Sequence, residues 1–424
     1  MVVWLLVLFI FVAIVRPTHR WPELDGFPLF DLYLLTLLFL PLLMFRVFWN
    51  SDAKLFRGNI LLLGMLLYSF AIVISQWFSP FVVLFEPPAP NIWFRFMVFL
   101  VFFVLSVRTE RDLKIIVTAV PIFCFFVLTL DLWHFLQGNV RVGSPTMRER
   151  LGSAGNITGI NVYAAWIGAM LPLIAPLLTL CKRYWHYLFV LGYVLLSIRL
   201  ITLTGSRAGL VLLVGLGVLF LLFSRYRFRW ISIILLAIPI GWFTLSESQQ
   251  LRYRTMWDPT IAVGETASNE RRGEDLIRGF RILSEYPLFG TGAGSGQEMG
   301  GGSISHHNLI GQVAGELGTF GFLAFLFMLV SFGINHYNIW RNYKYLQEKN
   351  LGKEGLYCWR VSMAAMYGVA ALLLGGLGFG QAYVTMWSYF AAFQIVAVQI
   401  MQEKVATAME GKLLPGLPTM PSRQ

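Results

Sequence analysis

Apolar residues run along the chain in long blocks that short polar segments separate. The blocks lie at roughly 2–15, 28–48, 58–79, 92–107, 113–136, 157–181, 186–204, 208–223, 228–245, 308–334, 356–377 and 382–401. A helix needs about 20 apolar residues to cross the hydrocarbon core of a bilayer, and runs of this length fit helices better than barrel strands. The pattern therefore predicts an all-α, polytopic membrane protein with about 12 transmembrane helices.

One long polar stretch interrupts these blocks. This stretch, 246–305, is predicted to be a large loop that divides the chain. Nine helices are predicted in 1–245 before it, and three helices in 306–401 and a cytoplasmic tail at 402–424 are predicted after it. A loop of this length is usually functional or has structure of its own.

Two segments of the loop have distinct patterns. Leu276, Phe280 and Leu283 recur at helical intervals within 270–285, which predicts a short amphipathic helix at the membrane surface. Residues 290–303 are rich in glycine and are expected to be flexible. They lack the GxxxxGK[ST] pattern and follow no predicted strand, so the sequence does not favour nucleotide binding.

Composition agrees with a membrane protein, since 57% of the residues are hydrophobic and only 13% are charged. An N-terminus in the cytoplasm places 19 of the 33 Lys and Arg residues in inner loops, as the positive-inside rule requires. The long loop is then outside. We expect the net charge of +11 to reflect binding of the inner face to anionic membrane lipid together with an arginine-bearing site, so nucleic-acid binding is not needed to account for it.

All eight lysines fall on the inner side in this topology, so every outer basic residue is arginine. The pattern is either chance in a small sample or a preference for guanidinium groups, which bind planar anions in a bidentate manner.

Three arginines stand out. Arg207, in "LTGSRAGL", begins an apolar block at membrane depth, where an arginine is usually paired or functional, although it can also reach out to the interface. Arg271 and Arg272 lie at the start of the amphipathic segment, before its first apolar residue Leu276, and ion pairs with Glu270 or Glu274 are the simpler explanation for either one alone.

His307 precedes a long apolar run that starts at Asn308. Histidine titrates near pH ~6.5 and can act as a base at neutral pH, whereas a polar cap is the simpler role. The neighbouring His306 diverges from it by about 100° on a helix, and the sequence contains no HExxH motif, so no metal site is predicted. Glu316 lies nine residues after His307, which is about 13.5 Å along a helix. At that distance it does not contact His307, so we expect it to make a structural hydrogen bond.

Arginines and a histidine suit a reaction in which guanidinium groups neutralise an anionic leaving group and a base activates a hydroxyl. At these residues the chain resembles the bacterial O-antigen ligase and polymerase superfamily of membrane glycosyltransferases. The resemblance rests on "TGSRAG" with Arg207, on Arg272 followed by "YPLFGTGAG", and on "HNLIGQVAGELGTFG", which begins at His307. Leu276 stands where the family often has tryptophan.

The resemblance implies a metal-independent, inverting transfer at the periplasmic face of the bacterial inner membrane, without a cofactor. The donor would be a glycan on undecaprenyl diphosphate. Arg207 and Arg272 would hold the diphosphate and His307 would activate the acceptor hydroxyl, with Arg271 and His306 as alternatives at the two doubled positions. Asn308 and Glu316 would support the site.

The resemblance leaves several reactions open. A ligase joins O-antigen to lipid A–core, whereas a polymerase joins repeat units of O-antigen or exopolysaccharide to a glycan acceptor. A protein O-glycosylating ligase usually has a longer C-terminal part than this chain. A transporter for a lipid-linked glycan belongs to another class and should show paired half-repeats with broken helices, and no internal repeat is visible in the sequence.

Overall fold

The computed structural model describes residues 2–24, 26–27, 31–49, 59–81, 89–138, 151, 159–224, 226–254, 256, 258, 266–295, 308–378, 380 and 382–410. Every regular element among these residues is helical, as predicted, and none is a strand. The elements are α1 (Val2–Val15), α2 (Pro17–Arg20), η1 (Pro22–Leu24), α3 (Leu32–Trp49), α4 (Ile60–Trp77), α5 (Ala89–Ser106), α6 (Glu110–Leu136), α7 (Ile160–Met170), η5 (Leu171–Leu173), α8 (Ile174–Leu177), α9 (Tyr184–Leu203), α10 (Arg207–Phe223), α11 (Arg227–Phe243), α12 (Glu247–Arg254), α13 (Thr266–Glu285), α14 (Leu309–Glu348), α15 (Gly352–Gly376) and α16 (Met386–Met409).

Several helices have the length and hydropathy of transmembrane segments, so the chain is a multi-pass membrane protein. Seven in the described part of the chain meet both criteria: Val2–Arg20, Ile60–Trp77, Glu110–Leu136, Ile160–Leu177, Tyr184–Leu203, Leu309–Glu348 and Gly352–Gly376. Shorter apolar helices cover Trp93–Ser106 and Arg207–Phe223. The count of about 12 spans, the topology and the domain boundaries stay predictions.

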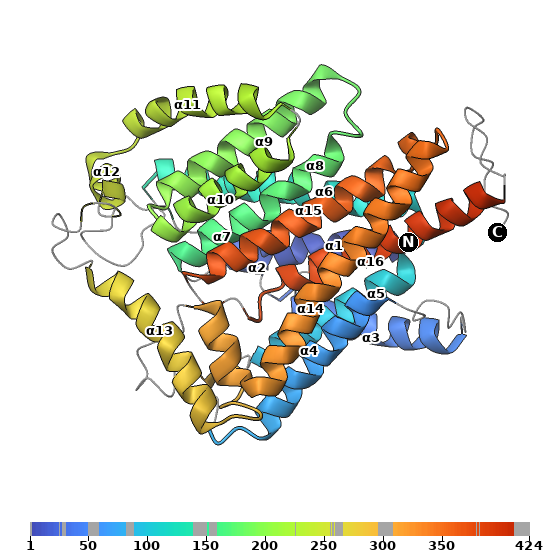
Figure 1. Ribbon diagram of the computed structural model, residues 1–424, viewed down its shortest axis with the longest axis horizontal. Coiled ribbons are helices and arrows are strands. Elements are labelled where there is room, and N and C mark those ends of the chain that lie inside the picture. Colours follow the sequence, from blue (N-terminus) through green and yellow to red (C-terminus); the bar gives the residue numbers. More distant parts are fainter. Residues whose placement is uncertain are drawn as a thin grey trace.

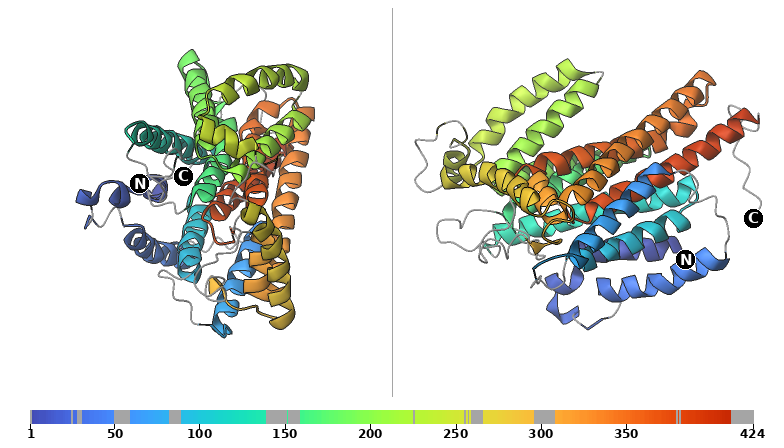
Figure 2. Two further views of the ribbon diagram at one scale, coloured as in Figure 1. Left: turned by 90° about the vertical axis from the view of Figure 1, so that its left-hand side faces the viewer. Right: turned by 60° about the horizontal axis from the view of Figure 1, so that its bottom comes forward.

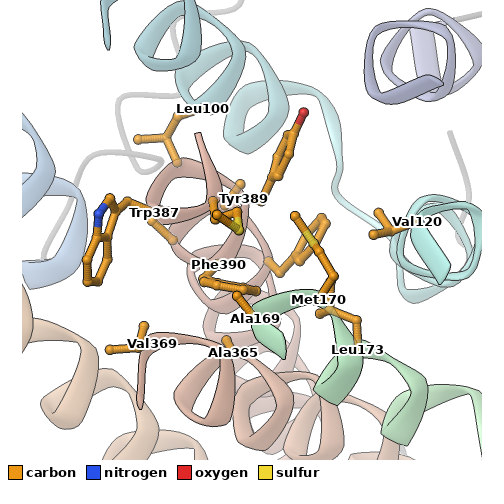
Figure 3. Packing of buried hydrophobic residues seen from close by; sticks show 14 of the residues in the cluster. Leu100, Val120, Ala169, Met170, Leu173, Ala365, Val369, Trp387, Tyr389 and Phe390 are labelled. Carbon is orange, nitrogen blue, oxygen red and sulfur yellow. The ribbon is translucent and has the colours of Figure 1, made fainter. Parts of the chain in front are cut away.

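The helix α16 lies in the middle of the bundle, beside α15 and the long α14 (Figures 1 and 2). A helix that is apolar all round is typically buried on every side, and nearly all residues of α16 up to Met401 are buried. Figure 3 shows Trp387, Tyr389 and Phe390 of α16 among side chains from α5, α7 and α15. A Cβ on Gly368 of α15 would lie 2.3 Å from the Phe390 ring, so the ring packs directly on the backbone of α15.

The first part of the predicted cytoplasmic tail at 402–424 is helical, because α16 continues to Met409. Lys404 anchors this extension through an ion pair with Glu110 at the start of α6. The remainder of the predicted tail, residues 411–424, lies outside the described residues.

The amphipathic helix predicted in the long loop is present as α13, which starts four residues before the predicted residue 270 and ends at Glu285. The face that is buried within the protein contains Asp275, Gly279 and Ile282, whereas Phe280 of the predicted apolar face is 44% exposed. Since Gly279 brings the backbone of α13 against that of α14, the contact is set by small residues, which the hydrophobic pattern does not reveal. Its position at a membrane surface stays a prediction.

The backbone contact between α13 and α14 leads to a prediction about stability. Gly279→Ala is expected to lower the melting temperature by several degrees, because the new Cβ would lie 2.3 Å from the Gly311 carbonyl oxygen and overpacking costs roughly 1–3 kcal/mol. Gly217→Ala in α10 is the matched control, since nothing lies within 4 Å of its added Cβ. Thermal unfolding of the detergent-solubilised variants measures the effect, and equal melting temperatures would contradict the close crossing.

Candidate functional site

The "TGS" sequence before Arg207 forms the turn that starts α10. The Ser206 N–H donates to Thr204 Oγ1 at 3.1 Å, and Gly205 has a φ of +60°, which favours glycine. Ser206 is the N-cap, and its Oγ accepts from the Gly209 N–H at 3.0 Å. Arg207 is therefore the first residue of α10, and its side chain is only 6% exposed.

A second helix start carries the predicted "HN" motif. Asn308 is the N-cap of α14, and its Oδ1 accepts from the N–H groups of Ile310 at 2.9 Å and Gly311 at 3.0 Å. Asparagine is among the preferred N-cap residues because its side chain satisfies these N–H groups. Asn308 thus has a capping contact in the structure. His306 and His307 lie outside the described residues.

The C-terminal end of α15 brings these two helix starts together. A Cβ on Gly378 would lie 2.7 Å from Ala208 Cβ, and a Cβ on Gly376 would lie 2.7 Å from Leu309 Cβ. The residues next to Arg207 and Asn308 therefore contact the same three-residue segment. Helix N-termini carry partial positive charge and unpaired N–H groups that favour anions, so this end of the bundle suits a negatively charged ligand.

The helix α13 carries the other predicted arginines, Arg271 and Arg272, and its register against α14 sets their level along that helix. It runs beside the first part of α14 (Figure 1), with Leu276 against Gly311 and Ile282 against Gly315. Residue numbers rise together along both helices, so Arg272, one turn before Leu276, is level with Asn308, about one turn before Gly311. Only the helical backbone of Arg271 and Arg272 is described.

Glu316 makes the structural hydrogen bonds that the sequence predicts. Its side chain is buried, and Oε2 accepts from the Gly294 N–H at 2.9 Å, Gln312 Nε2 at 3.3 Å and Tyr383 Oη at 2.6 Å. The carboxylate therefore joins α14 to two other segments: Gly294, in the segment before α14, and Tyr383, in the segment before α16.

The helix α14 is broken at Gly318, which the apolar pattern did not predict. Gly318 has φ +66° and ψ −168°, and the two parts of the helix meet there at a sharp bend (Figure 1). The carbonyl oxygen of Glu316, which lies just before the break, accepts from Ser75 Oγ at 2.6 Å and from the Gly292 N–H at 2.9 Å. Such partners are required where backbone groups leave a helix inside a membrane protein.

Part of the glycine-rich segment is ordered, contrary to the expectation of a flexible stretch. Residues 290–295 pack against the break in α14, where Thr291 N–H donates to the Gly315 carbonyl at 3.1 Å and Ser79 Oγ donates to the Thr291 carbonyl at 2.6 Å. Positive φ angles at Gly290, Gly292 and Gly294 let the backbone follow this path. Glycine serves here for close backbone approach, and the remaining predicted residues, 296–303, lie outside the described part.

The sequence patterns did not predict a buried ion pair between Arg20 and Asp131, which contacts Tyr163 of α7. Arg20 Nη1 lies 2.8 Å from Asp131 Oδ1, and Tyr163 Oη donates to Asp131 Oδ2 at 2.7 Å. Asn161, two residues before Tyr163, accepts from Ser206 Oγ at 2.6 Å. These contacts link the N-terminal helices to the turn before Arg207, and the isolated Asp131 in an apolar run was the signal.

No group of three or more His, Cys, Asp or Glu side chains suited to a metal ion occurs among the described residues. The structure places three of the predicted segments: the start of α10 with Arg207, the part of α13 with Arg271 and Arg272, and the start of α14 at Asn308. All three are next to helices or loops that the hydrogen bonds of Glu316 connect.

Comparison with known families bears directly on this region. Residues 191–326, about a third of the chain, match the family model described as O-Antigen ligase. The chain carries a domain of the O-antigen ligase family. The match supports membership of the O-antigen ligase and polymerase superfamily, which the motifs predict, and it supports a glycosyl-transfer role in lipopolysaccharide biosynthesis. No curated protein matches the chain at a significant level.

The family match covers the elements that build the site. It begins in α9 and ends in α14, so it includes Arg207, the whole of α13, residues 290–295 and Glu316. The turn at Gly376–Gly378 and Tyr383 lie beyond it, although both contact residues within it.

The buried carboxylate leads to a prediction about the framework. Glu316→Ala is expected to lower the melting temperature strongly, because it leaves the Tyr383 hydroxyl, the Gln312 amide and the Gly294 N–H without this acceptor. Each unsatisfied buried group costs roughly 1–3 kcal/mol. Glu403→Ala, at an exposed position on α16, is the control, and thermal unfolding in detergent is the measurement. A Glu316→Ala protein as stable as the control variant would show that the framework carries no stability.

Proposed function

We propose that this protein transfers a glycan from undecaprenyl diphosphate to an acceptor hydroxyl at the periplasmic face of the bacterial inner membrane. The reaction we favour is O-antigen ligation to lipid A–core, without a metal ion or cofactor. The observation that carries the proposal is that the starts of α10 and α14, at Ala208 and Leu309, contact one segment at the end of α15. Both helix starts lie within the match to the O-antigen ligase family.

The donor diphosphate would bind between α10, α13 and α14. Arg207 and Arg272 would neutralise the phosphate oxygens, since guanidinium groups match such oxygens in a bidentate manner. The N-termini of α10 and α14 would add partial positive charge. Together these groups would stabilise the charge that develops on the leaving diphosphate. Arg271 is the alternative to Arg272.

His307, directly before the N-cap Asn308, would act as the general base. It would take the proton of the acceptor hydroxyl as that oxygen bonds to the anomeric carbon of the donor sugar. The bond from the anomeric carbon to the phosphate oxygen breaks in the same step, and its electrons leave with undecaprenyl diphosphate. A single displacement of this kind inverts the configuration at the anomeric carbon. His306 is the alternative base.

The same residues would serve a repeat-unit polymerase, because the donor and the leaving group are the same. The two functions differ only in the acceptor, which is lipid A–core for the ligase and a growing glycan for the polymerase. The family match is compatible with both.

Deletion of the gene in its host, followed by gel analysis of the surface lipopolysaccharide, separates these functions. Core lipid without O-antigen, together with polymer retained on the undecaprenyl carrier, is the result that ligation predicts. Core lipid bearing a single repeat unit would assign the polymerase function instead. An unchanged lipopolysaccharide ladder would contradict both roles in O-antigen assembly.

A further inference from the structure

A cavity of about 640 Å³ lies between α10, α14 and α15 at the end of α10 opposite to Arg207. Its walls include Leu219 and Phe223 of α10, Trp340 of α14, and Trp359 and Met363 of α15. The volume falls within the roughly 300–1,000 Å³ that is typical of small-molecule sites. Figure 1 shows the junction of α14 and α15 on the far side of the molecule from α13.

The cavity is lined almost entirely by apolar and aromatic surface. The one imidazole in its wall, His336, is held within the protein, since Nδ1 lies 2.9 Å from Ser362 Oγ and the ring stacks on Trp359 with centroids 5.0 Å apart. The cavity opens outward, because Phe223 is 73% and Tyr337 56% exposed. An open, apolar pocket of this kind fits a hydrocarbon chain and offers little to a polar ligand.

Basic side chains border the cavity on the side of the α14–α15 junction. Lys344 lies over the Trp340 ring, with Nζ 4.2 Å from its centroid. Arg360 precedes Met363 and Tyr367 by three and seven residues, so it shares their face of α15. Neither cation forms an ion pair with a described carboxylate.

We propose that this cavity binds an acyl chain of an anionic glycerophospholipid, with the lipid phosphate at Lys344 and Arg360. The two halves of the site match the two halves of such a lipid. The aromatic and methionine side chains cover the hydrocarbon chain, and Lys344 and Arg360 meet a phosphate at the membrane surface, where each basic residue adds attraction to anionic lipid. The site lies apart from Arg207 and does not depend on the transferase function.

The test measures the shift in melting temperature that an added lipid causes in the purified, delipidated full-length protein. Phosphatidylglycerol is compared with phosphatidylcholine and with undecaprenyl phosphate. The wild type is expected to show a larger shift with phosphatidylglycerol than with either other lipid. Lys344→Gln combined with Arg360→Gln should reduce that shift to the phosphatidylcholine level. Arg108→Gln combined with Arg111→Gln, which removes two positive charges at exposed positions around the start of α6, should not.

Two further variants test the hydrocarbon half of the site. Met363→Trp and Ala370→Leu both fill the cavity and should reduce the phosphatidylglycerol shift. Because the shift is measured within each variant, a change in its basal stability does not affect the comparison. Equal shifts with phosphatidylglycerol and phosphatidylcholine, a larger shift with undecaprenyl phosphate, or an undiminished shift in both filled variants would each overturn the proposal.

Discussion

Replacement of His307 by alanine is expected to reduce glycan transfer by roughly 10²–10⁴-fold, the usual contribution of a general base. The effect should appear in kcat, because the imidazole acts on the acceptor hydroxyl as the new bond forms. The helix that follows His307 is capped by Asn308, so the substitution should leave folding and membrane insertion intact. The measurement is the rate of product formation by purified variants at saturating donor.

His306→Ala is the matched control, since it removes the same side chain at the adjacent position. It should keep most of the activity. The reverse result, with His306→Ala inactive and His307→Ala active, would move the base to His306. Activity near the wild-type level in both variants would exclude a histidine base at this helix start.

Arg207→Ala is expected to reduce transfer by roughly 10²–10³-fold, as does the loss of one donor that stabilises developing negative charge. Arg207 is 6% exposed and is the first residue of α10. A lysine in its place keeps the positive charge but loses the bidentate geometry of the guanidinium group. Arg207→Lys should therefore recover only part of the activity. Arg272→Ala should show a loss similar to that of Arg207→Ala.

Arg199→Ala is the control for an arginine in the preceding helix. Its guanidinium donates to the hydroxyl and carbonyl oxygens of Thr244, and it has no proposed contact with the donor. Its activity should stay close to that of the wild type when normalised to folded protein. Full activity in Arg207→Lys and Arg207→Ala would remove Arg207 from the diphosphate site.

Local sequence patterns predicted the parts of the structure that depend on residues close together in the sequence. The apolar blocks predicted an all-α membrane protein, and 270–285 predicted most of α13. The helix start at Asn308 was visible because a polar residue precedes a long apolar run. The hydrogen bonding of Glu316 followed from its distance of about 13.5 Å from His307 along a helix, which favoured a structural role.

Contacts between distant segments were beyond those patterns. The break at Gly318 is stabilised by residues 290–292 and by Ser75, none of which is near it in sequence. The crossing of α13 and α14 depends on Gly279 and Gly311, which a hydrophobic pattern ignores because glycine has no side chain. Hydropathy also gives no sign that Tyr383 would bind Glu316.

The most direct test of the account is transfer by the purified protein alone, with an undecaprenyl-diphosphate-linked glycan as donor and lipid A–core as acceptor, in the presence of EDTA. The account predicts a glycosylated lipid A–core product with inverted anomeric configuration and a rate that EDTA does not change. No product with folded wild-type protein, or activity lost in EDTA and restored by a divalent ion, would contradict it.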